Sequence, residues 1–291
     1  MPRSAPTEEF EQDESAASGS GHGRGETGSL QRGLALVEAL QMAQRPVSAT
    51  ELAEATGQPL STVHRLLQVL IQQSYVLRDD NKRYLAGPKA LLPLNLYHPL
   101  NVLRRDAREY LRTLRDQFRQ TATLIVFLGM ERLIVELAIE NESISPYQAT
   151  HLKSPLHGAA SGKVLLASLT RAQRGRLLGA GPLERRTPNT ITDLAALERE
   201  LDLVRTQGFA VAVDENHVGL SATAAPIQAG PDQVIGCFVL AGLTSKFPRE
   251  TVHAAGHVVK MTADLFSIGT SAMRPMATAL AKEPSALGST D

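Results

Sequence analysis

The 291-residue sequence predicts an α+β protein with an N-terminal winged helix-turn-helix and a C-terminal domain of mixed strands and helices. Two observations carry this prediction. Within residues 29–88, the patterns of three helices are followed by two short apolar strands around a polar tip. From residue 98 onward, strand and helix patterns follow one another, and the 43% of hydrophobic residues is enough for a packed core.

The charges of the chain are balanced in number but unevenly distributed. Lys plus Arg and Asp plus Glu number 30 each, which at first sight argues against a polyanionic partner. Residues 1–28 alone sum to −4, however, so the rest of the chain carries +4. Because this segment is also rich in Ser, Ala and Gly, we expect a disordered acidic tail over 1–28. A flexible C-terminal tail is expected over 273–291.

Membrane, secreted and metal-binding proteins are disfavoured by the sequence. The longest apolar run is shorter than the about 18 residues of a membrane helix, and no secretory signal pattern opens the chain. A single cysteine, Cys237, excludes an internal disulfide and a Cys-rich zinc site, and the eight histidines show no metal-ligand spacing. We therefore expect a cytoplasmic protein that uses no metal and no other cofactor.

The first three predicted helices carry the start and stop signals of a helix-turn-helix. Apolar residues repeat at helical spacing over 30–42, and Ser48 with Glu51 forms a capping box that opens the next helix. Gly57 stands where a left-handed residue would end that second helix. A third helix is predicted over 61–70, with its apolar residues on one side and its polar residues on the other.

The polar side of this third helix is the candidate DNA-reading surface. Short polar side chains at the start of such a helix reach base edges in the major groove, and an arginine one turn further can bind guanine O6 and N7. Basic residues at the hairpin tip are placed for phosphates. Ser61 and Thr62 alone would equally suit an N-cap, but the whole motif with its wing favours DNA binding. The candidate DNA-binding residues are Ser61, Thr62, His64, Arg65, Gln68, Lys82 and Arg83.

A second domain is predicted over 98–272, after a linker helix at 89–97. An amphipathic helix that ends near Phe118 opens it, because apolar residues recur there at three- and four-residue steps. The predicted strands are 121–128, 133–139, 209–213, 222–227 and 234–241, and the further helices are 162–169, 172–178, 194–206 and 249–266.

A loop of small residues over 158–163 leads into the predicted helix at 162–169. It is not a phosphate loop, because only three residues separate its glycines and Val164 follows its lysine. The free backbone N–H groups at the start of a helix suit a carboxylate. Ala160 and Ser161 are therefore candidate effector contacts, and a purely structural tight turn is the alternative.

Three polar residues near predicted strand or helix ends are further candidates. Asp214 and Glu215 end a predicted strand, and contact with a ligand or exposure to solvent are both open for them. No helical His/Glu spacing supports a metal or an acid–base site there. His157 has no partner set by the neighbouring sequence, so a packed or N-cap role is the alternative to a ligand contact.

The apolar run at 234–241 holds the single cysteine. A buried, inert thiol is the ordinary state of Cys237 in such a strand. Strand alternation places Val239 and Ala241 on the same side of the strand as the thiol.

These motifs together resemble the IclR-type family of bacterial transcriptional regulators. The resemblance implies a GAF-like effector-binding domain behind the winged helix-turn-helix and linker helix, and homodimers or homotetramers on double-stranded operator DNA. It also implies that the 158–163 loop forms one wall of the effector pocket. One departure is Leu60, where the family often has a basic residue, which puts the operator sequence in doubt. The segments that carry the resemblance are 29–36, 48–57, 61–67, 84–87, 155–167, 207–209, 214–215 and 224–227.

We therefore expect a transcriptional regulator whose operator binding responds to a small-molecule effector, such as a small organic or aromatic acid. No nucleophile–base pair or metal set is visible, so no catalytic activity is expected. An enzyme or a protein-interaction module with an appended helix-turn-helix is the alternative. The candidate effector-binding residues are His157, Ala160, Ser161, Asp214, Glu215, Cys237, Val239 and Ala241.

Overall fold

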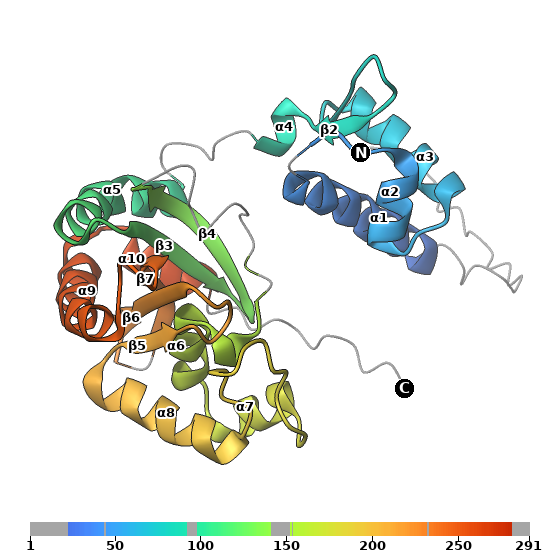
Figure 1. Cartoon of the computed structure of the whole chain (residues 1–291). Coiled ribbons are helices and arrows are strands. Elements are labelled where there is room, and N and C mark those ends of the chain that lie inside the picture. The colour runs from blue at the N-terminus through green and yellow to red at the C-terminus, as the bar shows by residue number, and fades with distance from the viewer. Residues whose placement is uncertain are drawn as a thin grey trace, which may run out of the picture. The chain divides into compact units, whose positions relative to one another are not determined.

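The computed structural model describes residues 23–43, 45–91, 98–140, 152, 154–231 and 233–280. The chain divides into two compact units, Met1–Leu92 and Pro93–Asp291 (Figure 1). Within the described part of the chain, no helix is long and apolar enough to cross a membrane.

The N-terminal unit is a three-helix bundle with a two-stranded wing. Its three longer helices pack around one core, in which Leu36, Leu52, Val63 and Leu67 are fully buried. Val47 pairs with Tyr84 through two backbone hydrogen bonds of 2.9 and 2.7 Å, and this contact extends the wing. The elements are α1 (Gly23–Met42), α2 (Ala49–Thr56), α3 (Leu60–Gln72), β1 (Val76–Arg78), β2 (Tyr84–Ala86) and α4 (Pro88–Leu91).

Local capping fixes the start and the end of α2, as the sequence predicts. The Glu51 backbone N–H donates to Ser48 Oγ over 3.2 Å, and the Ser48 N–H donates to the Glu51 carboxylate over 2.7 Å. Gly57 ends α2 in the left-handed region with φ of 63°, where a side chain would be strained. One detail differs from the expectation. No side chain caps α3, because Pro59 occupies its N-cap and Ser61 and Thr62 already lie inside its first turn.

Two expectations for the N-terminal unit do not match the structure. Helix α1 begins at Gly23, so residues 23–28, expected in the acidic tail, are helical, while residues 1–22 lie outside the described part. Of the expected linker helix, α4 covers only its start, and residues 92–97 are not described.

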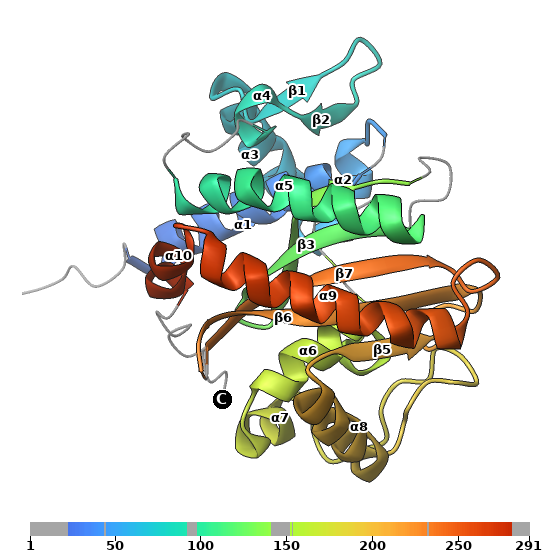
Figure 2. The same ribbon diagram turned by 90° about the vertical axis from the view of Figure 1, so that its left-hand side faces the viewer.

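The C-terminal unit is built on a five-stranded antiparallel sheet of order β4-β3-β7-β6-β5. Helices α5, α9 and α10 pack on one face, and α6 lies on the other beside α8 and α7 (Figure 2). The strands are β3 (Thr121–Leu128), β4 (Glu131–Ala138), β5 (Ala210–Val213), β6 (Leu220–Gly230) and β7 (Gln233–Leu243). The helices are α5 (Pro99–Phe118), α6 (Ala160–Ser168), α7 (Arg171–Leu178), α8 (Leu194–Gln207), α9 (Arg249–Gly269) and α10 (Met273–Leu280), with a 3-10 turn, η2 (Leu156–Gly158), before α6.

Strand alternation divides the core into two layers. Leu124 and Phe238 join the α5 and α9 side of the sheet. Cys237, Val239 and Ala241 lie on the α6 side together with Ala160, which is the arrangement predicted from their alternation in the sequence.

Helix α10 replaces part of the expected C-terminal tail. Residues 273–280 are helical because Met273 and Met276 are buried against the core below α5 and α9. The sequence predicted a tail from residue 273 onward, since its Ala, Ser and Pro content resembles that of a frayed end. Residues 281–291 lie outside the described part of the chain.

Candidate DNA-binding helix and effector site

Helix α3 presents the predicted DNA-binding residues on one solvent-facing side. Ser61, His64, Arg65 and Gln68 are exposed, and Thr62 is half-buried. Within the described residues, the Arg65 guanidinium has no hydrogen bond or ion pair, so all its N–H donors are available. The opposite side of α3 is anchored in the core, which holds the polar side in a fixed orientation.

The two basic residues of the wing differ in their surroundings. Lys82 is exposed at the tip, with its backbone in the left-handed region at φ of 60°. Arg83 is also exposed, but its guanidinium donates to the Pro46 carbonyl over 3.2 Å and lies 3.8 Å from the Glu51 carboxylate. A hydrogen bond from Arg45, together with the Ser48 contacts, lowers the pKa of Glu51 to about 2. The Arg83 guanidinium therefore already has partners within the N-terminal unit, whereas the Lys82 side chain is exposed to solvent.

In the C-terminal unit, the loop of small residues places the start of α6 against the sheet. Ala160 and Ser161 form the first turn of the helix and are buried. A Cβ on Gly162 would lie 2.1 Å from the Leu156 carbonyl oxygen, so only glycine permits this close approach. No side chain caps α6, and its first backbone N–H groups depend on other partners.

A buried arginine that the sequence analysis missed lies beside this helix start. Arg132 on β4 is 2% exposed, and its Nη1 donates to Ser161 Oγ over 3.2 Å. Its Nη2 donates to the Leu152 carbonyl over 3.3 Å, and to the carbonyl and hydroxyl oxygens of Ser154. The strand was predicted from residue 133. Alternation with Ile134 would have pointed Arg132 inward if the strand had been started two residues earlier.

A buried hydroxyl faces the same side of the sheet. Thr123 on β3 is fully buried and pairs in register with Val239. Its Oγ1 has no hydrogen-bond partner within the described residues, which is unusual for a buried polar group. The start of α6, Arg132 and Thr123 thus bring hydrogen-bond donors to an otherwise apolar layer.

Lys163 is the centre of a buried ion cluster one turn into α6. Its Nζ donates to Glu200 Oε1 over 2.9 Å, to Glu215 Oε1 over 2.8 Å and to the Val211 carbonyl over 2.8 Å. Burial raises the pKa of Glu215, and the attraction of Lys163 opposes that rise. Because the loop at 158–163 is not a phosphate loop, the local sequence predicts no role for Lys163. Its buried position depends on α8 and β5, which are distant in sequence.

Two further predicted effector residues, like Ser161 and Glu215, have hydrogen-bond partners inside the protein. The Asp214 carboxylate accepts from the Gly219 N–H and from Thr244 Oγ1, each over 2.7 Å, and its own backbone has φ of 54°. It closes the turn between β5 and β6. His157 Nε2 donates to the Glu184 carbonyl over 2.8 Å, which matches the packed role considered for it.

Cys237 has the environment of an inert thiol. It is fully buried in β7, and burial raises its pKa well above the ordinary value. Across the residues that the structure describes, no group of three or more His, Cys, Asp or Glu side chains is arranged to hold a metal ion.

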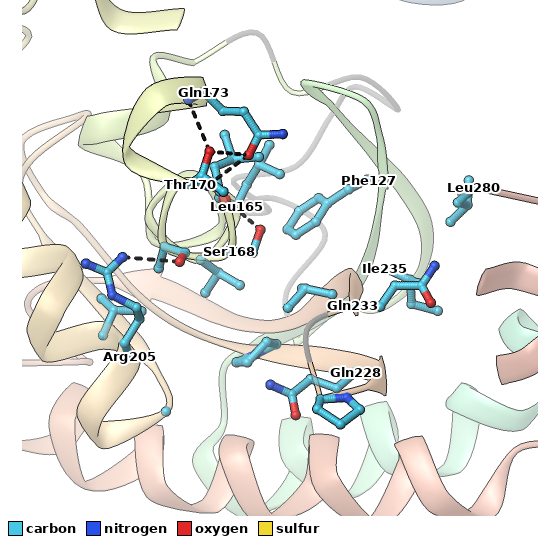
Figure 3. Close-up of a pocket in the computed structure, with 18 of the residues that line it drawn as sticks. Phe127, Leu165, Ser168, Thr170, Gln173, Arg205, Gln228, Gln233, Ile235 and Leu280 are labelled. Atoms are coloured by element: carbon cyan, nitrogen blue, oxygen red, sulfur yellow. Dashed lines mark hydrogen bonds between the residues drawn. The ribbon is translucent and has the colours of Figure 1, made fainter. Parts of the chain in front are cut away.

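A cavity of about 740 Å³ lies at the opposite end of α6 from its start (Figure 3). Phe127, Leu165 and Ile235 line it together with polar residues such as Ser168 and Gln228. None of the eight predicted effector residues is part of this lining. The predicted residues instead surround the start of α6, where the side chains are closely packed.

Two segments of the chain match known protein families. Residues 29–80 match the IclR helix-turn-helix domain, and residues 97–268 match the family described as bacterial transcriptional regulator IclR C-terminal. The chain belongs to the IclR family. As an IclR-family transcriptional regulator, it combines a helix-turn-helix DNA-binding domain with a C-terminal effector-binding domain. The family and the fold class expected from the sequence are thereby confirmed.

Individual relatives resemble most of the chain. The Pca regulon regulatory protein of Pseudomonas putida is 30% identical over 208 residues, which is 71% of each chain. The crystal structure of an IclR regulator from Alicyclobacillus acidocaldarius is 28% identical, with a TM-score of 0.69 over 83% of this chain and 98% of that chain. An IclR homologue from Microbacterium hydrocarbonoxydans, solved with 4-hydroxybenzoate, has a TM-score of 0.71 over 85% of this chain and 99% of that chain. At 22% identity, that last likeness shows the shared fold alone.

Proposed function

We propose that this regulator binds its operator through the polar side of α3. A small organic acid that binds beside α6 would lower or raise the affinity for the operator. The unengaged guanidinium of Arg65 on the exposed side of an anchored helix is the observation that carries the proposal. In this proposal residues 29–88 bind DNA, 89–97 link the two domains and 98–272 bind the effector. The protein acts as a homodimer or homotetramer on DNA in the bacterial cytoplasm.

The DNA contacts divide by chemistry. Arg65 is suited to the O6 and N7 acceptors of a guanine, and His64 and Gln68 can add hydrogen bonds to neighbouring bases. Ser61 and Thr62 in the first turn, and Lys82 at the wing tip, are suited to phosphates. Arg83 is expected to contribute less, because it already contacts Pro46 and Glu51.

The effector site is proposed at the start of α6. The backbone N–H groups there and the Ser161 hydroxyl suit a carboxylate, and the unpartnered Thr123 hydroxyl supplies one more hydrogen bond. Ala160, Cys237, Val239 and Ala241 belong to the closely packed apolar layer on this side of the sheet, and a ligand bound at the start of α6 would lie against this layer. His157, Asp214 and Glu215 shape this region through their own internal partners.

Regulation without catalysis is part of this proposal. The relatives are named as regulators, and the raised pKa of the Cys237 thiol disfavours the thiolate that a nucleophile requires. Turnover of the bound acid by the full-length protein would contradict this part of the proposal.

Replacement of Arg65 tests the DNA-binding assignment. Arg65→Ala should weaken binding to operator duplexes, selected by the wild-type protein from a randomised pool, by about 1–3 kcal/mol. Fluorescence anisotropy titration measures the change. Arg176→Ala is the matched control, because it removes the same charge from an exposed position on α7. Equal operator affinities of Arg65→Ala and Arg176→Ala would remove Arg65 from the proposed reading surface.

A further inference from the structure

Helix α9 exposes a row of large apolar side chains on the side that faces away from its core. Met261, Leu265 and Ile268 are 62%, 61% and 86% exposed, and Ala254 is also exposed, with Val258 half-buried between them. The opposite side of the helix is completely buried in the sheet core. Figure 2 shows α9 running along the outside of its layer. We call these five residues (Ala254, Val258, Met261, Leu265 and Ile268) the outer stripe of α9.

The spacing of the outer stripe is that of a helix-packing surface. Its members follow one another at steps of four, three, four and three residues, so they lie on one side of the helix over about 21 Å. Isolated exposed apolar residues are normal, but a continuous row of them marks a contact surface. Of the five residues, Val258 also packs partly against the core of the C-terminal unit, whereas Val252, Val259 and Phe266 anchor α9 from the other side.

We infer that the outer stripe of α9 packs against the same stripe of a second copy of this chain, with the two helices antiparallel and Met261 at the two-fold axis. This inference rests on the proposed function, in which two copies act on one operator. A two-fold contact requires a self-complementary surface. Centred on Met261, the stripe satisfies this requirement, because small Ala254 then lies opposite large Ile268, and Val258 lies opposite Leu265.

The charged neighbours of the stripe favour the same alignment. His257 and Asp264 flank the stripe on one side, four positions before and three positions after its centre. In the antiparallel alignment His257 of one copy lies next to Asp264 of the second copy, and the pair occurs twice. Asp264 already accepts from Lys260 of its own helix over 2.7 Å, and its carboxylate can accept a further hydrogen bond from a ring N–H of His257 of the second copy.

Engineered cysteines test this contact in the full-length protein. Met261→Cys should form a disulfide-linked dimer on mild oxidation, because residue 261 meets its own copy at the axis. Ala254→Cys alone should link poorly, whereas Ala254→Cys combined with Ile268→Cys should link well. The native Cys237 is buried and does not compete. Val218→Cys, at an exposed position in the turn before β6, is the matched control for chance collisions.

The outcomes separate this inference from the proposed function. Dimer formation by Met261→Cys well above that of Val218→Cys supports the contact. Cross-linking no greater than in the control overturns it. Protection of the thiol introduced by Met261→Cys from alkylation, without dimers, also overturns it, because another part of the same chain would then cover the stripe. Operator binding by the wild-type protein, measured in parallel, decides the proposed function independently. Leu265→Asp should lower the sedimentation coefficient without changing the circular dichroism spectrum.

Discussion

At the scale of single residues, the α6 side of the sheet contains buried polar groups that a purely structural layer would not require. A buried hydroxyl without a partner costs about 1–3 kcal/mol, and Thr123 is such a group among the described residues. Arg132 reaches the same region and holds Ser161 at the start of α6. The burial of the Thr123 hydroxyl is explained if a polar ligand supplies its missing hydrogen bond.

Thr123→Val separates a ligand contact from a structural role. The change removes the hydroxyl and keeps the shape, so the free energy of unfolding should stay the same or rise. Binding of an acid found by a thermal-shift screen of carboxylic acids should weaken by about fivefold, the value of one hydrogen bond. Urea unfolding and calorimetric titration measure the two effects.

The control for this change is a second buried threonine with the opposite expectation. Thr223 Oγ1 donates to the Ala210 carbonyl over 3.0 Å, so Thr223→Val should lower the free energy of unfolding by about 1 kcal/mol. If Thr123→Val destabilised the protein as much as Thr223→Val does, or left acid binding unchanged, the Thr123 hydroxyl would not be a ligand contact.

The site could be predicted from the sequence only where its signal is local. Ala160 and Ser161 could be proposed from the sequence because a small-residue loop before a helix is visible in a few consecutive residues. Arg132, Thr123 and Lys163 were not found, because their burial is created by strands and helices that are distant in the chain. A single polar residue inside an apolar strand can therefore belong to a site even where no local motif marks it.

At the scale of elements, the Lys163 cluster joins α6 to α8 and β5. One lysine faces two carboxylates, Glu200 and Glu215, so the cluster carries an excess of one negative charge when both are ionised. Burial raises the pKa of Glu215 despite Lys163, which means that the folded protein binds this proton more tightly than the unfolded chain does. The contribution of Glu215 to stability is therefore full at or below its ordinary pKa of 4.5 and falls as the pH rises through the raised value.

Glu215→Gln should remove the loss of stability that the ionisation of Glu215 causes as the pH rises. Because glutamine is neutral at every pH and can still accept from Lys163, the stability of the variant relative to the wild type should increase between about pH 5 and about pH 8. Urea unfolding at the two pH values measures the difference.

Glu198 provides a comparison, because its pKa is lowered whereas that of Glu215 is raised. Its hydrogen bonds from Arg174 lower its pKa, so its stabilising contribution is present above 4.5 and is lost as the pH falls. Glu198→Gln should therefore lose stability relative to the wild type as the pH rises toward 4.5, and the difference should change little between about pH 5 and about pH 8. If both variants changed with pH in the same direction, the raised pKa of Glu215 would not be the cause.

Element boundaries were predictable where caps mark them. The capping box at Ser48 and the left-handed Gly57 are short-range signals, and the bounds of α2 follow them closely. Helix α10 was missed because its order comes from the burial of Met273 and Met276, a tertiary contact that composition does not reveal. Local hydrogen bonding is visible in the sequence, whereas docking onto a core is not.

At the scale of the whole molecule, the neutral total charge conceals a gradient along the chain. Residues 1–22 contain one basic and five acidic residues and sum to −4, residues 29–88 sum to +1, and the remainder is positive. Within the DNA-binding unit, Arg45 and Arg83 already pair with Glu51. Few cations are therefore left for phosphates, so specific base contacts are expected to supply much of the discrimination between operator and other DNA.

Removal of residues 1–22 should therefore strengthen binding to non-operator DNA. The net charge rises from 0 to +4, which favours association with a polyanion, and the effect should shrink between about 50 mM and about 200 mM salt because added ions screen it. Anisotropy titration of a random duplex at both salt concentrations measures the change. A full-length variant with the five acidic residues replaced by their amides keeps the length and removes the negative charge. If this variant bound like the wild type while the truncated protein bound more tightly, the segment would act by occupying space, and the electrostatic account would be wrong.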